Sequence, residues 1–329
     1  MINKMLAFFV RPWLRRNWYS EEEILAACSN ITSIRKRVYN FFWRMMRDPI
    51  KGEMLARSNM VLSIPDRIAA KYTEELLYLG SLGGELPMLP YKRAKTGMTS
   101  LKLAKVGRLG LVSVEHNGKN LFFPKFYTVE QVEYLYRYYV EKEGILGTGI
   151  LEKSPHSYVS HAFKVDDGDI LLDVGCSEGL FALDNLDRAS KVYLFETQKC
   201  WEKPNLATFS PYGDKVKVYN RFVGAKTDKH EIRLEDAVAN ESVEATYFIK
   251  MDIEGGERTV IADSERFLKQ HRVKLACAAY HRQDDAEFLA GKLKALGYEV
   301  EFSDGYMLPD INGFVYPYFR KGMIYARNY

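Results

Sequence analysis

The 329-residue sequence has few cysteines, no long hydrophobic run and little excess charge of either sign. Its four cysteines, Cys28, Cys176, Cys200 and Cys277, are far apart and form no C-x-x-C pair. This spacing argues against a zinc knuckle and against a disulfide framework. No apolar stretch reaches the roughly 18 residues that a membrane-spanning helix needs. The apolar residues 5–10 are followed by Arg11-Pro12 instead of a small-residue cleavage site, so we expect a cytoplasmic protein.

The net charge of +4 is too small to predict nucleic-acid binding. Its distribution is uneven, because residues 1–60 contain eleven Lys and Arg against five Asp and Glu, with many aromatic residues between them. One interpretation is a pair of amphipathic helices with a solvated basic face. The other is contact with an anionic surface, such as a membrane interface or a phosphorylated lipid-linked substrate.

One segment joins a predicted buried strand to a glycine-rich turn. The apolar residues 170–172 lead into Asp173-Val174-Gly175-Cys176-Ser177-Glu178-Gly179, and a helix-like run follows. Gly175 and Gly179 allow a sharp turn and let a ligand lie against bare main chain. A dinucleotide fingerprint begins with glycine, which makes room for a pyrophosphate, whereas a carboxylate at position 173 would repel phosphate. The loop therefore favours a ligand with positive charge, such as an ammonium or a sulfonium.

Two further predicted strands also end in acidic residues. Residues 191–195 end at Glu196, about 20 residues beyond the glycine loop, where an α/β nucleotide site holds ribose hydroxyls. Residues 245–251 end at Asp252-Ile253-Glu254-Gly255-Gly256-Glu257. Because ligands bind at the carboxyl ends of strands in open α/β sheets, we expect these acids to border one site.

Together these segments resemble the FkbM-type S-adenosylmethionine-dependent methyltransferases. The resemblance covers roughly residues 150–329, and its most specific part is the run 250–257; Ser154-Pro155-His156-Ser157-Tyr158 and Tyr280-His281-Arg282 add to it. It implies S-adenosylmethionine as cofactor and O-methylation of a hydroxyl on a sugar, glycan or related small metabolite. The family commonly has Thr-Leu-Asp where this chain reads Arg233-Leu234-Glu235-Asp236, which leaves the role of that acidic pair open.

The order of elements predicts an α/β fold like that of class I methyltransferases, with a Rossmann-like, mostly parallel sheet of seven strands. We expect the strands at 169–173, 191–195, 215–220, 245–251, 273–280, 298–302 and 322–327, the last inserted antiparallel. Residues 150–329 would form the cofactor-binding methyltransferase domain. Residues 1–149 would form a mainly helical domain for substrate recognition or docking, with helical runs at 67–79 and 128–139 and a β-hairpin turning at Asn117-Gly118.

The predicted site residues fall into two groups. The cofactor-binding group shares a position at strand ends or just before the first strand, and comprises Asp173, Gly175, Cys176, Ser177, Glu178, Gly179, Glu196, Asp252, His156 and Tyr158. The catalytic group is His281 with Asp252, since imidazole can accept a proton near neutral pH. Lys250, in an apolar strand, needs a partner, and an ion pair or a catalytic role would supply one. Asp252, Glu254 and His281 could also hold a divalent ion, and the use of a metal stays open.

Two other functions remain open. A nicotinamide-dependent oxidoreductase would also place an acid after its second strand, but it would need glycine at position 173. A non-catalytic binder would retain the cofactor pocket alone. A Ser-His-Asp hydrolase is disfavoured, because no G-x-S-x-G occurs at a strand-to-helix turn. The sequence identifies neither the methyl acceptor nor the oligomeric state.

Overall fold

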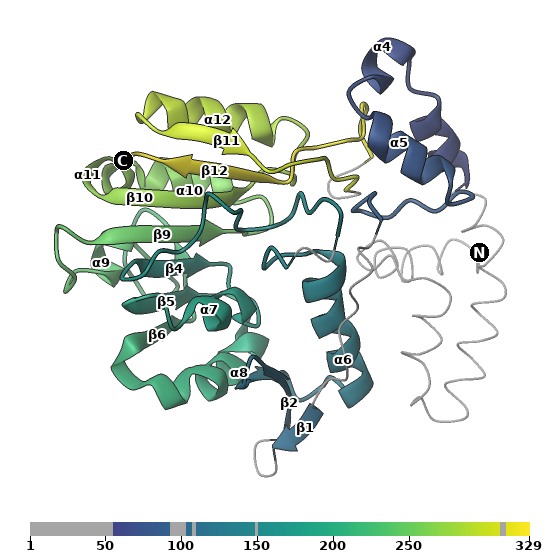
Figure 1. The fold of residues 1–329 in the computed structure, drawn as a ribbon. Coiled ribbons are helices and arrows are strands. Elements are labelled where there is room, and N and C mark those ends of the chain that lie inside the picture. Colours follow the sequence, from purple (N-terminus) through teal and green to yellow (C-terminus); the bar gives the residue numbers. More distant parts are fainter. Residues whose placement is uncertain (1–54, 93–102, 107–109, 149–150, 310–313) are drawn as a thin grey trace, which may run out of the picture.

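The structure is a computed structural model that describes residues 55–92, 103–106, 110–148, 151–309 and 314–329 (Figure 1). Most of the basic, aromatic-rich segment lies in residues 1–54, outside the described residues, so both interpretations of it stay predictions. Across the described ranges, none of the helices combines the length and the apolar character needed to cross a membrane.

A seven-stranded sheet forms the centre of the fold. Its strands are β4 (Ile170–Val174), β5 (Lys191–Phe195), β6 (Val216–Tyr219), β9 (Thr246–Met251), β10 (Arg272–Ala278), β11 (Glu299–Phe302) and β12 (Met323–Arg327). Strand β12 pairs antiparallel with both β10 and β11, and the other pairs are parallel. The α/β fold class, the seven strands and the antiparallel insertion of the last one are confirmed.

The sheet order is β11-β12-β10-β9-β4-β5-β6, so the strand order reverses between β4 and β9. The chain runs outward from β4 to β5 and β6, then returns to place β9 on the other side of β4. Val174 and Met251 are paired at the carboxyl ends of these two central strands. A ligand crevice is expected at such a reversal point, and the glycine loop and Asp252 follow directly from its two strands.

Alternate side chains of β4 enter two separate cores, as expected for a strand buried on both faces. Leu171 packs in one core, whereas Ile170 and Leu172 pack in the other. The first core includes α7 (Leu180–Asn185) and α8 (Lys199–Phe209); the second includes α9 (Leu234–Ala237), α10 (Glu257–Asp263), α11 (Glu265–Gln270) and α12 (Asp285–Ala295). Because each core contains helices from one side of the sheet, helices bury both faces of the sheet.

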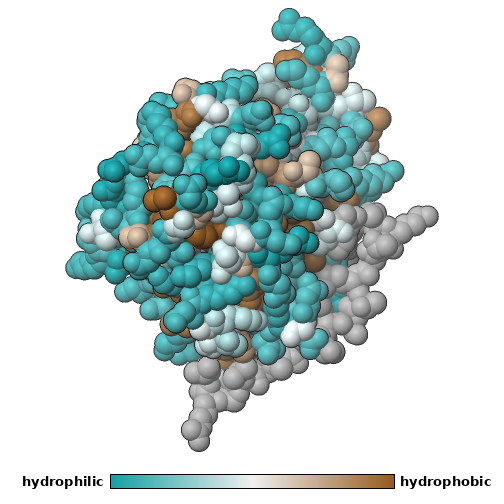
Figure 2. All heavy atoms as spheres, turned by 60° about the vertical axis from the view of Figure 1, so that its left-hand side comes forward, coloured by the Kyte–Doolittle hydropathy of each residue, from teal (hydrophilic) through white to brown (hydrophobic). Residues whose placement is uncertain are grey.

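On the face of the molecule seen in Figure 2, hydrophobic residues form small groups within a mainly hydrophilic surface.

A small antiparallel sheet precedes the central one. It contains β1 (Leu103–Val106), which the sequence did not predict, and the predicted hairpin β2 (Leu111–His116) and β3 (Lys119–Phe123). The hairpin turns at Asn117 and Gly118, both with positive φ. Helix α6 (Val129–Arg137) follows with a capping box at its start, and its last turn continues as the π-helix η1 (Tyr138–Lys142).

The predicted helical run at 67–79 is wrong as a single helix. The structure has α4 (Asp66–Ala69) and α5 (Thr73–Gly80), with a turn between them. Tyr72 is buried at this turn and stacks on Phe319, with ring centroids 4.5 Å apart. Burying this ring against the C-terminal segment therefore overrides the local helical pattern.

The remaining short elements lie between β6 and β9 or extend α8. The 3-10 helix η2 spans Ser210–Lys215, and β7 (Phe222–Val223) pairs with β8 (Glu231–Ile232). Phe123 and Val132 share the first core with Leu171, so residues on both sides of position 150 pack together. The division into domains at residues 149–150 stays a prediction.

Candidate active site

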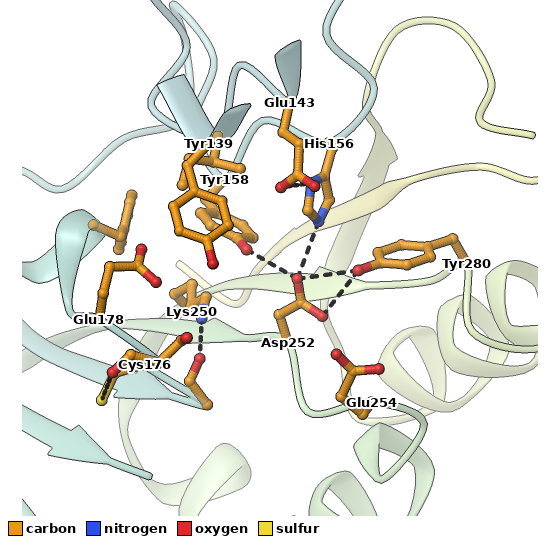
Figure 3. A pocket seen from close by; sticks show the side chains of 14 residues that line it. Tyr139, Glu143, His156, Tyr158, Cys176, Glu178, Lys250, Asp252, Glu254 and Tyr280 are labelled. Carbon is orange, nitrogen blue, oxygen red and sulfur yellow. Dashed lines mark hydrogen bonds and ion pairs between the residues drawn. The ribbon is translucent and has the colours of Figure 1, made fainter. Parts of the chain in front are cut away.

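A cavity of about 200 Å³ lies at the carboxyl ends of β4 and β9 (Figure 3). Three parts of the chain line it. The segment before the sheet contributes Tyr139, Glu143, Ile145, His156 and Tyr158; the glycine loop and α7 contribute Gly175, Cys176, Ser177, Glu178 and Phe181; the ends of β9 and β10 contribute Lys250, Asp252, Glu254 and Tyr280. Seven of the predicted site residues are among them. The cavity therefore lies at the position that the sequence predicts for the ligand.

The glycine loop is held against the end of β9. Gly175 has φ 78°, and a Cβ at this position would lie 2.1 Å from the carbonyl oxygen of Asp252. Gly179 has φ 80° and precedes α7, and a Cβ there would lie 2.7 Å from the ring of Phe209. Ser177 also has a positive φ of 46°, a conformation that costs energy for a residue with a side chain. Both glycines are therefore needed for the loop to pack as it does.

The structure does not place Asp173 in the cavity. Its side chain is fully buried beneath the loop, and its Oδ1 lies 3.2 Å from the ammonium of Lys250. Lys250 also donates a hydrogen bond of 2.5 Å to the carbonyl oxygen of Gly175. Burial raises the pKa of Asp173, while the charge of Lys250 acts in the opposite direction. Asp173 thus anchors the loop through Lys250, and its contact with the cofactor stays a prediction.

Glu196 also lies outside the cavity lining. Its Oε2 accepts a hydrogen bond from the backbone N–H of Ser177 at 2.9 Å, and its Oε1 accepts one from Gln198 N–H at 2.7 Å. The carboxylate therefore ties the glycine loop to the end of β5. Because each carboxylate oxygen can accept more than one hydrogen bond, the geometry is compatible with the predicted contact to a ribose diol.

Asp252 is the most highly connected acid of the cavity. Its Oδ2 accepts hydrogen bonds from His156 Nε2 at 3.0 Å and from the Tyr158 hydroxyl at 2.9 Å, and the Tyr280 hydroxyl lies 3.3 Å from both oxygens. Burial alone would raise the pKa of Asp252, but the hydrogen bond and charge of His156 and the charge of His281 outweigh it and lower the pKa. These donors hold Asp252 as an oriented anion.

His156 joins the segment before the sheet to the end of β9. While its Nε2 binds Asp252, its Nδ1 lies 3.3 Å from Glu143 Oε2. Burial works to lower the pKa of His156, but the hydrogen bonds to Asp252 and Glu143 prevail and raise the pKa to about 10. His156 is therefore a buried cation at neutral pH, and it fixes two carboxylates at the cavity wall.

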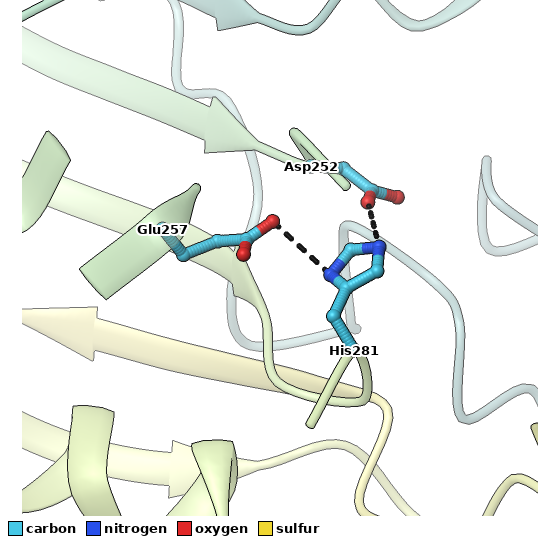
Figure 4. A group of neighbouring side chains, drawn as sticks. All are labelled: Asp252, Glu257 and His281. Carbon is cyan, nitrogen blue, oxygen red and sulfur yellow. Dashed lines mark ion pairs between the residues drawn. The ribbon is translucent and has the colours of Figure 1, made fainter. Parts of the chain in front are cut away.

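His281 lies behind Asp252 and does not line the cavity (Figure 4). Its side chain has no exposed surface. Nδ1 lies 3.1 Å from Glu257 Oε1, and Nε2 lies 3.5 Å from Asp252 Oδ1. Glu257 Oε1 also accepts a hydrogen bond from Ile253 N–H at 2.9 Å, which fixes that carboxylate. His281 can therefore act on a ligand only through Asp252 or after a rearrangement, and its catalytic role stays a prediction.

Glu178 has a different environment from Asp252. It lines the cavity, although only 5% of its surface is exposed. Burial raises the pKa of Glu178 to about 7, with the charge of Lys250 opposing this effect. A cationic ligand beside Glu178 would favour its ionised form, because an opposite charge nearby stabilises a carboxylate.

Sequence reasoning missed Tyr139, Glu143 and Ile145. They lie where α6 continues into η1 and its following turn. A π-helical turn changes which side chains share a face, and no motif in the sequence marks it. The pattern of apolar residues predicts the helix, but it does not predict that these side chains point into the cavity.

The strand order, with helices on both faces and a cavity at the reversal point, is that of a class I methyltransferase-like fold. The family model described as the methyltransferase FkbM domain matches residues 173–300. Over these residues the chain is similar to FkbM-type methyltransferases, and that similarity implies S-adenosylmethionine as methyl donor. The resemblance seen in the sequence is thereby confirmed.

Several solved structures are similar to this chain. Methyltransferase FkbM from Methylobacillus flagellatus is 22% identical, with 51% of this chain and 45% of that chain covered and a TM-score of 0.41. Precorrin-6y C5,15-methyltransferase from Geobacter metallireducens is 14% identical, covering 50% and 81%, with a TM-score of 0.32. An rRNA methylase from Streptococcus thermophilus is 14% identical, covering 50% and 87%, with a TM-score of 0.32. No curated protein matches the chain.

Proposed function

We propose that the protein transfers a methyl group from S-adenosylmethionine to a hydroxyl oxygen of a sugar, a glycan or a related small metabolite. The observation that carries the proposal is the cavity at the β4–β9 reversal point. One wall is the glycine loop of the methyltransferase domain, and the opposite wall carries carboxylates and tyrosine hydroxyls. A cofactor and a polar acceptor would meet between these walls.

The residues of the glycine loop fit this cofactor. Gly175, Cys176 and Ser177 line the cavity, and Glu178 adds a buried carboxylate. We assign Glu178 to the positive charge of the cofactor and Glu196 to its ribose. When bound, S-adenosylmethionine supplies a methyl carbon attached to a positively charged sulfur. Attack by an acceptor oxygen on this carbon would break the C–S bond and leave S-adenosylhomocysteine.

The opposite wall fits a polyhydroxy acceptor. Carboxylates of Glu143, Asp252 and Glu254 line it, and each can accept hydrogen bonds from hydroxyl groups. The hydroxyl groups of Tyr158 and Tyr280 converge on Asp252 and hold it in one orientation. Such fixed acceptors can hold an acceptor hydroxyl close to the methyl carbon, which lowers the barrier by proximity and orientation.

Asp252 is the group that we assign to the departing proton, with His281 behind it. The O–CH₃ bond forms as the hydroxyl loses its proton to the Asp252 carboxylate, which then releases it to solvent. Because its pKa is lowered, Asp252 alone is a weak base, and most of its contribution would be to orient the hydroxyl.

Calorimetric titrations with S-adenosylmethionine and with NAD test the cofactor. We expect the first to bind and the second not to bind, because Asp173 stands where a dinucleotide site needs glycine. Glu196→Ala should weaken S-adenosylmethionine binding by about 1.5–3 kcal/mol, the range for hydrogen bonds to a charged group. Exposed Glu202→Gln on α8 is the matched control. Binding of NAD alone would overturn the proposal.

The acceptor class is tested with a panel of mono- and oligosaccharides and small polyols, using a methyl-labelled cofactor. Label that appears as an O-methyl ether in the product supports the proposal. Label found only on nitrogen or carbon of other acceptors would contradict the assignment to hydroxyl oxygen, even if the cofactor binds as expected.

A further inference from the structure

Tyr139 lies at the cavity wall, on the π-helical turn η1. The main-chain N–H of Glu143 binds the carbonyl oxygen of Tyr138 at 2.9 Å and closes this turn. Residues four apart share a helix face, and Tyr139 and Glu143 both line the cavity. Figure 3 shows the ring of Tyr139 reaching into the cavity, with its hydroxyl on the side of Glu178.

The hydroxyl of Tyr139 differs from the other hydrogen-bond donors at the cavity. The hydroxyl groups of Tyr158 and Tyr280 bind Asp252, and the ammonium of Lys250 binds a main-chain carbonyl oxygen. Within the ranges of the chain that the structure describes, no residue forms a hydrogen bond with the hydroxyl of Tyr139. A tyrosine hydroxyl that is withdrawn from bulk water usually has a partner, so a ligand is the partner to consider here.

This hydroxyl stays protonated near neutral pH. Burial raises the pKa of Tyr139 well above its usual value, and the charges of Glu178 and Glu143 add to the effect. Tyr139 therefore presents a neutral O–H group to the cavity. Such a group donates a hydrogen bond, and the ligand must supply the oxygen that accepts it.

The reacting hydroxyl of the acceptor is a poor partner for Tyr139. In the proposed reaction it gives its proton to Asp252 and directs a lone pair at the methyl carbon. A hydrogen bond donated to the same oxygen would withdraw electron density from the attacking lone pair and weaken the nucleophile. A second oxygen of the acceptor carries no such cost, because its lone pairs take no part in the reaction.

We propose that Tyr139 selects the methyl acceptor by donating a hydrogen bond to a second oxygen of a polyhydroxy molecule whose reacting hydroxyl lies at Asp252. This inference rests on the proposed function and narrows its acceptor class to molecules with at least two oxygens inside one cavity of about 200 Å³. An alcohol with a single oxygen leaves the Tyr139 hydroxyl unpaired in the complex, and an unpaired polar group is how a site rejects such an analogue.

Methyl transfer to saccharides and to their monodeoxy analogues tests the proposal. The acceptors are those of the saccharide panel that take up the methyl label, each compared with analogues that lack one hydroxyl. For the wild type, we expect the loss of one particular hydroxyl to raise KM by about 2–10-fold, as for one neutral hydrogen bond. Tyr139→Phe should raise KM for the parent saccharide by a similar factor, keep kcat within about threefold, and no longer distinguish the parent from that analogue. Exposed Tyr329→Phe is the control and should behave as the wild type does.

Two further measurements separate this role from others. The dissociation constant of S-adenosylmethionine should stay within about twofold in Tyr139→Phe, whereas a tenfold loss would place the hydroxyl on the cofactor and overturn the proposal. The urea midpoint of Tyr139→Phe should match the wild type, while Tyr158→Phe should unfold earlier because it loses a bond to Asp252. An equally early midpoint in Tyr139→Phe would show that the fold itself uses the hydroxyl, which also overturns the proposal.

The outcomes also distinguish this inference from the proposed function. If Tyr139→Phe methylates saccharide hydroxyls and discriminates against the deoxy analogues as the wild type does, the role of Tyr139 is wrong while the proposed function stands. If the label never appears on a hydroxyl oxygen with the wild-type protein, the proposed function is wrong, and the role of Tyr139 is wrong with it.

Discussion

The ammonium of Lys250 lies 3.2 Å from Oδ1 of Asp173, and both side chains are almost fully buried. They come from adjacent strands, because Asp173 of β4 pairs in register with Lys250 of β9. Lys250 also binds the carbonyl oxygen of Gly175 and lies 4.9 Å from the centre of the Tyr158 ring. This pair thus connects the two central strands directly below the glycine loop.

Lys250→Met is expected to lower the free energy of unfolding by about 3–5 kcal/mol, because it leaves the buried carboxylate of Asp173 without a counter-charge. Urea denaturation measures this loss. The double variant Lys250→Met/Asp173→Asn should recover most of it, since no charge then remains unpaired. Lys269→Met removes an exposed ion pair with Glu265 and should cost less than about 1 kcal/mol. Equal losses in Lys250→Met and Lys269→Met would contradict this account.

Gly175→Ala tests the close packing of the loop on β9. The new Cβ would lie 2.1 Å from the carbonyl oxygen of Asp252, so the loop or the end of β9 must move. Gly118 has the same φ of 78° and open space around it, which makes Gly118→Ala a control for conformational cost alone, about 1–2 kcal/mol. We expect Gly175→Ala to be at least about 2 kcal/mol less stable than this control and to bind S-adenosylmethionine poorly.

Stability should depend on pH through Glu178. Its pKa rises from an unperturbed 4.5 to about 7 in the folded protein, so the folded state holds the proton more tightly than the unfolded state. The contribution to stability is therefore complete below about pH 4.5 and is lost as pH rises through about 7. Relative to Glu178→Gln, the wild type without cofactor should lose up to about 3 kcal/mol over this range, measured by urea denaturation at several pH values.

The same ionisation should control cofactor binding. The ionised form of Glu178 would pair with a cationic ligand, so wild-type affinity for S-adenosylmethionine should increase up to about tenfold between pH 6 and pH 8. Glu178→Gln should show a flatter profile, whereas the exposed control Glu202→Gln should follow the wild type. Identical profiles in wild type and Glu178→Gln would remove Glu178 from the contact with the cofactor charge.

Strand positions were readable from the sequence because a buried parallel strand is a short apolar run that ends at a turn signal. This holds for β4, β5 and β9, each of which ends near an acid. The position of Lys250 within an apolar strand also signalled a buried partner. The pattern did not predict where the side chain of Asp173 points. The motif locates the glycine loop, but it does not show on which side of the loop the carboxylate lies.

Contacts between segments far apart in the chain could not be predicted from the sequence for a related reason. Glu143 reaches the cavity through a π-helical turn and meets Asp252 through His156. Neither residue periodicity nor a local motif encodes such a contact, which depends on how α6 packs on the first core. The break at Tyr72 has the same origin, since its ring is buried against Phe319 from the far end of the chain.

The roles of Asp252 and His281 can be separated by measuring cofactor affinity and turnover for each variant on one accepted substrate. His281 does not line the cavity, so His281→Ala should leave the dissociation constant of S-adenosylmethionine within a few-fold while turnover falls at least about 10²-fold. Asp252→Asn should reduce turnover and also weaken cofactor binding, because the amide cannot hold His156, Tyr158 and Tyr280 as the carboxylate does. Near-normal turnover in His281→Ala would exclude it from proton removal. Orientation of the acceptor by Asp252 and its tyrosine partners would then have to account for the rate.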